Sequence, residues 1–344
     1  MKILLTGHLG YIGSVLAPRL LEKGHEVVGL DAGWFRDCRF GSEPVASIPE
    51  IVCDLRDLSP ETVRGFDAVV HLASLSNDPL GNLDSALTAD INTRATLELA
   101  EAARRAGVER FVFSSSCSTY GAAGDDFLDE SAELHPVTAY GRAKVDVELG
   151  LAAMSGDGFS PTYLRNATAY GLSPRLRLDL VLNNLTAWAY TTGRVYLMSD
   201  GSPWRPIVHV QDICSAFLAA LEAPRSVIHN QAFNVGQTSE NYRIRELADI
   251  IADVVPGSRI EMAPGAGPDK RCYRVDCDKI EAQLPGYRPE WSARRGAEEL
   301  YTAFRKADLK PHDLEAPAFF RLGRIEELIE GGRLSADLRW ATAA

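Results

Sequence analysis

The chain has 344 residues, of which 46% are hydrophobic and 24% are charged, proportions typical of a globular protein with a sizeable core. Its formal net charge of -11 argues against a general binder of nucleic acid or of anionic membranes. No apolar run approaches the roughly 18 residues of a membrane span, and the first one ends at Gly7, too early for a signal peptide. The six cysteines form no CxxC pair, so we expect reduced thiols, a cytoplasmic location and no metal site.

The first half of the chain alternates strand candidates with helical patterns. The strand candidates are KILLT (2–6), EVVGL (26–30), EIVC (50–53), DAVVHLA (67–73) and RFVFSS (110–115). Apolar residues recur at helical spacing over 12–23, although Pro18 counts against that helix, and over 84–106. The repetition of strand, helix and strand predicts an α/β fold with a doubly wound parallel sheet, whose ligands bind at the carboxyl ends of the strands.

From about residue 170 onward, frequent prolines divide the chain into shorter elements. We interpret residues 171–344 as a smaller, mixed α/β substrate-binding lobe. It would pack on a dinucleotide-binding domain of residues 1–170, with elements able to cross between the two.

The first strand leads into GHLGYIG, with glycines at 7, 10 and 13. Glycines at a strand end let backbone N–H groups approach a pyrophosphate at a helix N-terminus. The spacing is GxxGxxG rather than the usual GxGxxG of dinucleotide sites. Asp31 ends the second strand, where a carboxylate can bind an adenosine ribose and repel a 2′-phosphate, which favours NAD over NADP.

TAYGRAK (138–144) places Tyr140 and Lys144 four residues apart, on one face if the segment is helical. A phenol is a poor base at neutral pH, and a nearby ammonium is expected to lower its pKa. The pair could then exchange a proton in an alcohol–carbonyl interconversion.

Taken together, these motifs resemble those of the extended short-chain dehydrogenase/reductase family, in its NAD-dependent nucleotide-sugar epimerase/dehydratase group. The matching segments follow the family's order: TGHLGYIG (6–13), Asp31, DLRD (54–57), HLAS (71–74), FSSSCSTYG (113–121), YGRAK (140–144), LRNATAYG (164–171) and RPIVHVQD (205–212). The resemblance implies a Rossmann domain that binds NAD, and a nucleotide-sugar substrate.

The resemblance also implies residue roles. Tyr140 would be the catalytic acid/base, tuned by Lys144, and Ser116 would bind the reacting sugar oxygen. The implied cofactor-binding residues are Gly7, Gly10, Tyr11, Ile12, Gly13, Asp31, Asp54, Leu55, Leu72, Ala73, Ser74, Ser114, Tyr140 and Lys144. The implied substrate-binding residues are Ser116, Ser118, Thr168, Asn183, Asn184, Arg205 and Arg271.

The substrate side departs from the family pattern. Many members carry asparagine where Thr168 stands, and Asn166 lies two residues earlier, on the same face of a strand. Asn183 and Asn184 could also supply an amide to the substrate phosphates.

Residues 116–118 discriminate among the reactions of the family. The 4,6-dehydratases carry Thr-Asp-Glu where this chain has Ser116, Cys117 and Ser118, and the sugar-acid decarboxylases have glutamate at the last position. Cys117 is expected to point away from the substrate, because neighbouring residues of an extended chain face opposite sides. A site of serine, tyrosine and lysine favours 4-epimerisation through a 4-keto intermediate. The alternatives are a 4-ketoreductase and, less favoured, a 4,6-dehydratase or a non-catalytic NAD-binding protein. A homodimer through the helices at 84–106 and 138–153 would follow the family.

Overall fold

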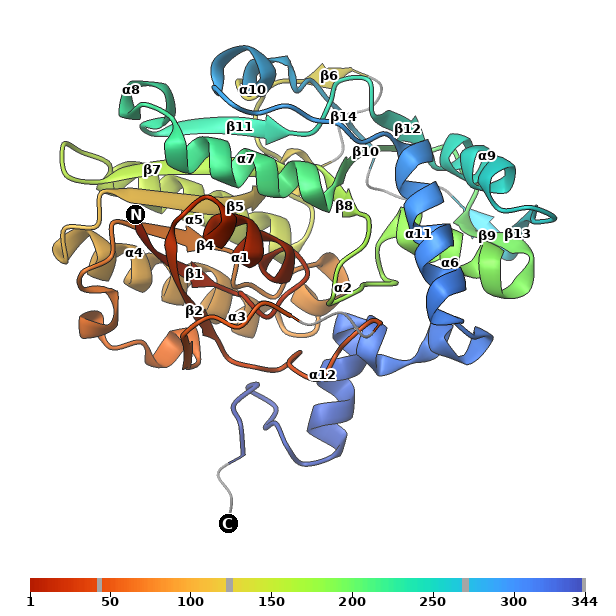
Figure 1. The fold of residues 1–344 in the computed structure, drawn as a ribbon, viewed down its shortest axis with the longest axis horizontal. Coiled ribbons are helices and arrows are strands. Elements are labelled where there is room, and N and C mark those ends of the chain that lie inside the picture. Colours follow the sequence, from red (N-terminus) through yellow and green to blue (C-terminus); the bar gives the residue numbers. More distant parts are fainter. Residues whose placement is uncertain (42–44, 122–125, 268–271, 342–344) are drawn as a thin grey trace.

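The computed structural model describes residues 1–41, 45–121, 126–267 and 272–341 (Figure 1). Its main layer is a seven-stranded sheet in which every neighbouring pair is parallel. In spatial order the strands are β11 (Gln231–Val235), β7 (Ser160–Asn166), β5 (Arg110–Ser116), β4 (Ala68–His71), β1 (Lys2–Thr6), β2 (Glu26–Asp31) and β3 (Glu50–Val52). The order reverses direction beside β1, as in doubly wound nucleotide-binding folds, and the predicted fold class is confirmed.

Helices cover both faces of this sheet because its strands are apolar on both sides. Ile3 and Leu5 of β1 pack in one buried cluster with α1 (Gly13–Glu22) and α7 (Val210–Glu222). Leu4 belongs to the opposite cluster, formed with α4 (Ala95–Arg105) and α5 (Ala139–Met154).

The predicted helices form with two local irregularities. Pro18 lies inside α1 without ending it. The stretch predicted as one helix over 84–106 divides into α3 (Ser85–Thr88), a π-helical segment (Ala89–Arg94) and α4. Within the π segment, the Asn92 side chain bonds to the backbone N–H and C=O of Leu75 at 2.8 and 3.1 Å. A widened turn that is anchored to a loop in this way is a known feature near functional sites.

The second lobe is built from short strands and helices around a separate apolar cluster. Its strands are β8 (Thr168–Tyr170), β10 (Trp204–His209) and β12 (Asn241–Arg243) in one sheet, β9 (Arg194–Ser199) with β13 (Arg259–Gly267), and β6 (Phe127–Leu128) with β14 (Arg274–Val275). Its longer helices are α6 (Val181–Thr192), α9 (Ile244–Val254) and α11 (Ala293–Ala307). The other α-helices of the described residues, in either lobe, are α2 (Asp78–Gly81), α8 (Arg225–Ile228), α10 (Asp278–Gln283) and α12 (Arg321–Glu330).

The two halves of the sequence interlock. Strand β11 and helix α7 both come from beyond residue 170, yet they complete the seven-stranded sheet and its covering layer. The division at 170/171 stays a prediction, and elements from beyond that point do contribute to the sheet of the first half. Among the described residues, no helix has the length and apolar character that a bilayer crossing requires.

Candidate active site

A cavity of about 760 Å³ opens at the carboxyl ends of the sheet strands and continues between the two lobes. It brings together residues between Gly7 and Tyr273 from both lobes. The predicted residues that line it are Gly7, Gly10, Tyr11, Ile12, Gly13, Asp31, Asp54, Leu55, Leu72, Ala73, Ser74, Ser114, Ser116, Ser118, Tyr140, Lys144, Thr168, Asn184 and Arg205.

The glycine loop folds back on itself between β1 and α1. Gly7 adopts a φ of +73°, a conformation that favours glycine. A Cβ on Gly13 would lie 2.3 Å from the carbonyl oxygen of Gly7 and 2.6 Å from the Cα of His8. No side chain of the described residues caps the N-terminus of α1. The loop therefore leaves backbone donors and open space at a helix start, which fits the pyrophosphate of NAD.

Asp31 lies at the end of β2 beside this loop. Its carboxylate accepts hydrogen bonds from the backbone N–H groups of Leu9 at 3.1 Å and Gly33 at 2.7 Å. Burial raises the pKa of Asp31, against the effect of these two bonds. A desolvated carboxylate with acceptor capacity left over gains from a further hydroxyl donor, so Asp31 fits an adenosine ribose.

Asp54 reaches the same end of the cavity already paired. Its carboxylate caps the turn after β3 by accepting from the Arg56 N–H at 2.9 Å, and it bonds the Arg56 guanidinium at 2.7 Å. The pKa of Asp54 is lowered, because these bonds outweigh its burial.

Ser116, Tyr140 and Lys144 meet where β5 faces the start of α5. The Tyr140 hydroxyl lies near Ser116, whose side chain favours the phenolate and so acts to lower the pKa of Tyr140. Lys144 Nζ lies 5.4 Å from the centroid of the Tyr140 ring and donates to the carbonyl of Ser114 at 2.8 Å. The spacing of four residues thus places both side chains on one face of the helix, as predicted.

The expected lowering of the Tyr140 pKa by Lys144 is not found in the protein alone. Burial, followed by the nearby Asp78 carboxylate, raises the pKa of Tyr140 to about 12. Burial also lowers the pKa of Lys144 to about 7, so the ammonium is itself disfavoured where it was expected to act. Desolvation outweighs the pairwise effect because both groups lie deep in the cavity.

The two residues after Ser116 face different surroundings. Cys117 is buried outside the cavity lining, where its thiol donates to the carbonyl of Arg165 at 3.1 Å. Ser118 lines the cavity, and its buried Oγ has no hydrogen-bond partner among the described residues. Cys117 therefore packs away from the site, as expected, and Ser118 offers a hydroxyl to a ligand.

Two predicted substrate residues need correction or fall outside the description. Asn183 does not line the cavity. It is fully buried, accepts from the Gly171 N–H at 2.9 Å and donates to the carbonyl of Arg177 at 3.0 Å, so its amide stabilises the turn before α6. Arg271 lies outside the described residues.

Sequence motifs missed Asp78 and Arg177, and they gave Asn166 only as a neighbour of Thr168 on the same strand face. Asp78, at the start of α2, accepts from Thr138 Oγ1 at 2.7 Å. Arg177 pairs with Asp179 at 2.8 Å and lies near Tyr140, where its charge favours the phenolate. Asn166 donates to Ser114 Oγ at 3.1 Å, while its buried Oδ1 has no partner in the described part of the chain. For Arg177, the local pattern that could have pointed to the site is the charged stretch RLRLD (175–179), which lies in a loop.

Comparison with known proteins supports the assignment of this cavity. A model of the NAD dependent epimerase/dehydratase family matches residues 3–236. UDP-glucose 4-epimerase of Corynebacterium glutamicum is 30% identical over 330 residues, which cover 89% of this chain and 96% of that protein. UDP-glucuronic acid decarboxylase 1 of Arabidopsis thaliana is 26% identical over 314 residues, which cover 89% of this chain and 70% of that one.

Among solved structures, MoeE5 in complex with UDP-glucuronic acid and NAD has a TM-score of 0.78 and 27% identity, with coverage of 89% of this chain and 100% of MoeE5. The family model spans well over half of the sequence. The protein therefore belongs to the NAD-dependent epimerase/dehydratase family, a group of enzymes within the extended short-chain dehydrogenases/reductases.

Proposed function

We propose that the protein catalyses NAD-dependent 4-epimerisation of a nucleotide sugar, with a UDP-hexose as the first substrate to test. The observation that carries this proposal is the composition of the cavity. It joins the glycine loop to Ser116, Tyr140 and Lys144, while Cys117 is buried elsewhere and position 118 holds a hydroxyl. The likeness to the Corynebacterium glutamicum UDP-glucose 4-epimerase supports the choice of substrate.

In this reaction, the residues that line the cavity would bind the substrate and cofactor and transfer a proton. Bound NAD would accept the C4 hydride and return it. Tyr140 would take the proton of the C4 hydroxyl and give it back to the 4-keto oxygen, with Ser116 holding that oxygen. Lys144 would hold the cofactor ribose. Thr168, Asn184 and Arg205 line the part of the cavity contributed by the second lobe, where they would bind the diphosphate, together with Arg271.

The first experiment tests turnover directly. Purified protein is incubated with UDP-glucose, UDP-galactose and UDP-glucuronic acid, and the products are identified by NMR and mass spectrometry. We expect the C4 epimer at unchanged mass without added reductant. Tyr140→Phe should lower kcat by at least about a hundredfold, because it removes the acid/base. Tyr163→Phe is the matched control, since that hydroxyl bonds Asn230 at 2.6 Å outside the cavity lining. Wild-type turnover by Tyr140→Phe would refute the mechanism.

Bound cofactor separates epimerase from ketoreductase. An epimerase regenerates its NAD in every turnover and keeps it, whereas a 4-ketoreductase must exchange it. We expect near-equimolar NAD in the purified, denatured protein by mass spectrometry. A cofactor-free protein that turns over only with added NADH or NADPH would favour the reductase.

One observation favours dehydration as a second candidate function. Asp78 brings a carboxylate into the cavity near Tyr140 from outside residues 116–118. If it served elimination, the product would lose one water and Asp78→Asn would abolish its formation. For epimerisation, we expect Asp78→Asn to keep turnover and shift the pH profile towards acid, because the Asp78 charge raises the pKa of Tyr140.

We also propose that the protein is a homodimer, joined through α4 and α5, and that it works in the cytoplasm. Leu149 on α5 is 65% exposed, which supports an interface there. All six cysteines are free thiols, which supports a reducing compartment.

A further inference from the structure

The last described residues of the chain lie against the N-terminal domain rather than against the substrate lobe (Figure 1). We call residues 333–341 the C-terminal strap; it follows α12. Its leucines, Leu334 and Leu338, are buried in a cluster with Trp34, Leu75 and Ile91. Trp34 and Ile91 also line the cavity, so the strap forms the layer directly behind one end of the cofactor site.

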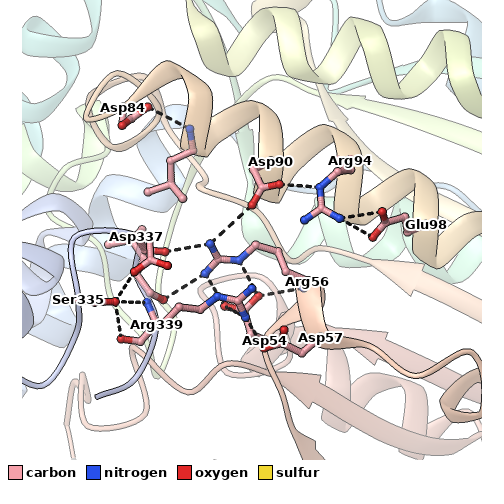
Figure 2. A network of polar contacts seen from close by, with 12 residues as sticks. Asp54, Arg56, Asp57, Asp84, Asp90, Arg94, Glu98, Ser335, Asp337 and Arg339 are labelled. Atoms are coloured by element: carbon pink, nitrogen blue, oxygen red, sulfur yellow. Dashed lines mark hydrogen bonds and ion pairs between the residues drawn. The ribbon is translucent and has the colours of Figure 1, made fainter. Parts of the chain in front are cut away.

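Two arginines join the strap to the turn after β3 (Figure 2). The Arg56 side chain is only 2% exposed and donates to the carbonyl groups of Asp337 at 2.9 Å and Leu338 at 3.3 Å. The same guanidinium holds Asp54 at 2.7 Å. From the strap, Arg339 pairs with Asp54 at 3.5 Å and also with Asp57. Asp54 is thus held from both sides.

A third contact reaches the loop after β2. The indole Nε1 of Trp340 donates to the carbonyl of Ala32 at 2.6 Å. Ala32 follows Asp31 and lines the cavity. The strap therefore ties together two neighbouring chain segments, 31–34 and 54–55, which follow the paired strands β2 and β3 and contribute to the cavity wall at the predicted adenosine position.

The strap is held in shape by these contacts. Leu338 has a φ of 58°, a region that a leucine occupies only where its surroundings impose it. Its backbone N–H bonds Ser335 at 2.9 Å, and Ser335 also bonds the backbone of Arg339. A compact turn thereby points Arg339 and Trp340 at their partners on the N-terminal domain.

We propose that the C-terminal strap retains NAD by locking the adenosine end of its site. Segments 31–34 and 54–55 lie side by side after the paired strands β2 and β3. The strap would hold both segments in place through Arg56, Arg339 and Trp340, so that the cavity wall around the adenosine loosens less often. These three act as positioning residues, through Asp54 and Ala32, rather than as catalytic residues. The proposal concerns residence of the cofactor and does not depend on which sugar the enzyme converts.

The test measures exchange of bound NAD. Each protein is loaded with NAD, mixed with excess isotopically labelled NAD, and sampled over time by mass spectrometry after denaturation. We expect Arg339→Ala and Trp340→Phe each to speed exchange by up to about tenfold, the upper range for losing one charged or neutral hydrogen bond. Arg339→Lys retains the charge and should restore slow exchange to within about threefold of wild type.

The control is Arg294→Ala. Arg294 is a half-exposed arginine that pairs with Asp253 at 3.0 Å on the second lobe, away from the cavity. The Arg294→Ala variant should exchange NAD at the wild-type rate. All variants should unfold at similar temperatures with saturating NAD. Exchange at the wild-type rate in both Arg339→Ala and Trp340→Phe overturns the proposal. So does equal acceleration by Arg294→Ala. Neither result bears on the sugar assay, which tests the proposed function separately.

Discussion

Lys144 is a buried charge with few compensating contacts. Its Nζ bonds one carbonyl and lies 4.6 Å from the Phe113 ring centroid. Burial lowers its pKa from 10.5 to about 7, so between these values the unfolded chain binds more protons than the folded one. Stability must therefore rise with pH across that window. We expect Lys144→Met to raise the free energy of unfolding by about 2 kcal/mol or more below pH 7.

Urea unfolding of both proteins from about pH 6 to pH 10.5 measures this difference. The gain should shrink as the pH rises through the window, because wild-type Lys144 is already neutral in the folded state and loses its proton in the unfolded state as the pH passes 10.5. A gain that stays constant with pH would mean that packing, rather than the charge, sets the effect.

Local motifs point to the three proposed catalytic residues, and the structure places all three in the cavity. Tyr140 and Lys144 are predictable because helical spacing alone places them together, and Ser116 because it ends a strand of a parallel sheet. Asp78 and Arg177 were not predictable, since α2 and the loop before α6 approach Tyr140 only in the folded chain. The direction of the Tyr140 pKa shift also depends on burial, which spacing does not reveal.

At the scale of elements, the β1–loop–α1 unit depends on the absence of a side chain at Gly13. A Cβ on Gly13 would meet the backbone of Gly7 and His8 at 2.3 and 2.6 Å, atoms that cannot move without opening the loop. We expect Gly13→Ala to lose NAD binding in calorimetry and to cost about 2 kcal/mol of stability. Gly158→Ala is the control, because its Cβ would meet no atom within 4 Å. Equal NAD affinity in the two variants would contradict the loop geometry.

The helix boundaries in the structure agree with those predicted from the sequence where apolar residues recur regularly. They differ where a contact with a distant part of the chain changes the helix. Pro18 was a reason to doubt α1, but the helix continues because Leu16 and Leu20 on either side are fully buried against the sheet. The helix over 84–106 was predicted whole, yet the contact of Asn92 with Leu75 accompanies a widened turn. A polar side chain that satisfies a distant loop leaves no periodic signal in the sequence.

For the whole molecule, the sequence predicted the layers better than the connections. Alternating strands and helices indicate a parallel sheet, but they do not tell that β11 returns from the second half to pair with β7. The strap is the extreme case. Residues 333–341 contact residues 32 and 54–57, nearly three hundred positions earlier, and no short-range pattern predicts such a contact.

The oligomeric state is a property of the whole molecule. Leu149 on α5 is 65% exposed. A twofold dimer that places α5 beside its own copy would cover this side chain. We expect the wild type to elute as a dimer at micromolar concentration in chromatography with light scattering. Leu149→Asp should shift it to monomer, because a carboxylate at a twofold contact faces its equivalent.

Met262→Asp provides the matched control for this experiment. Met262 is 45% exposed on β13, in the second lobe, so the same charge there should leave the dimer intact. Because Leu149 does not line the cavity, a monomeric Leu149→Asp variant should still bind NAD and turn over substrate. Wild-type protein that runs only as monomer would refute the dimer, whereas a monomeric variant without bound NAD would show that assembly supports the site.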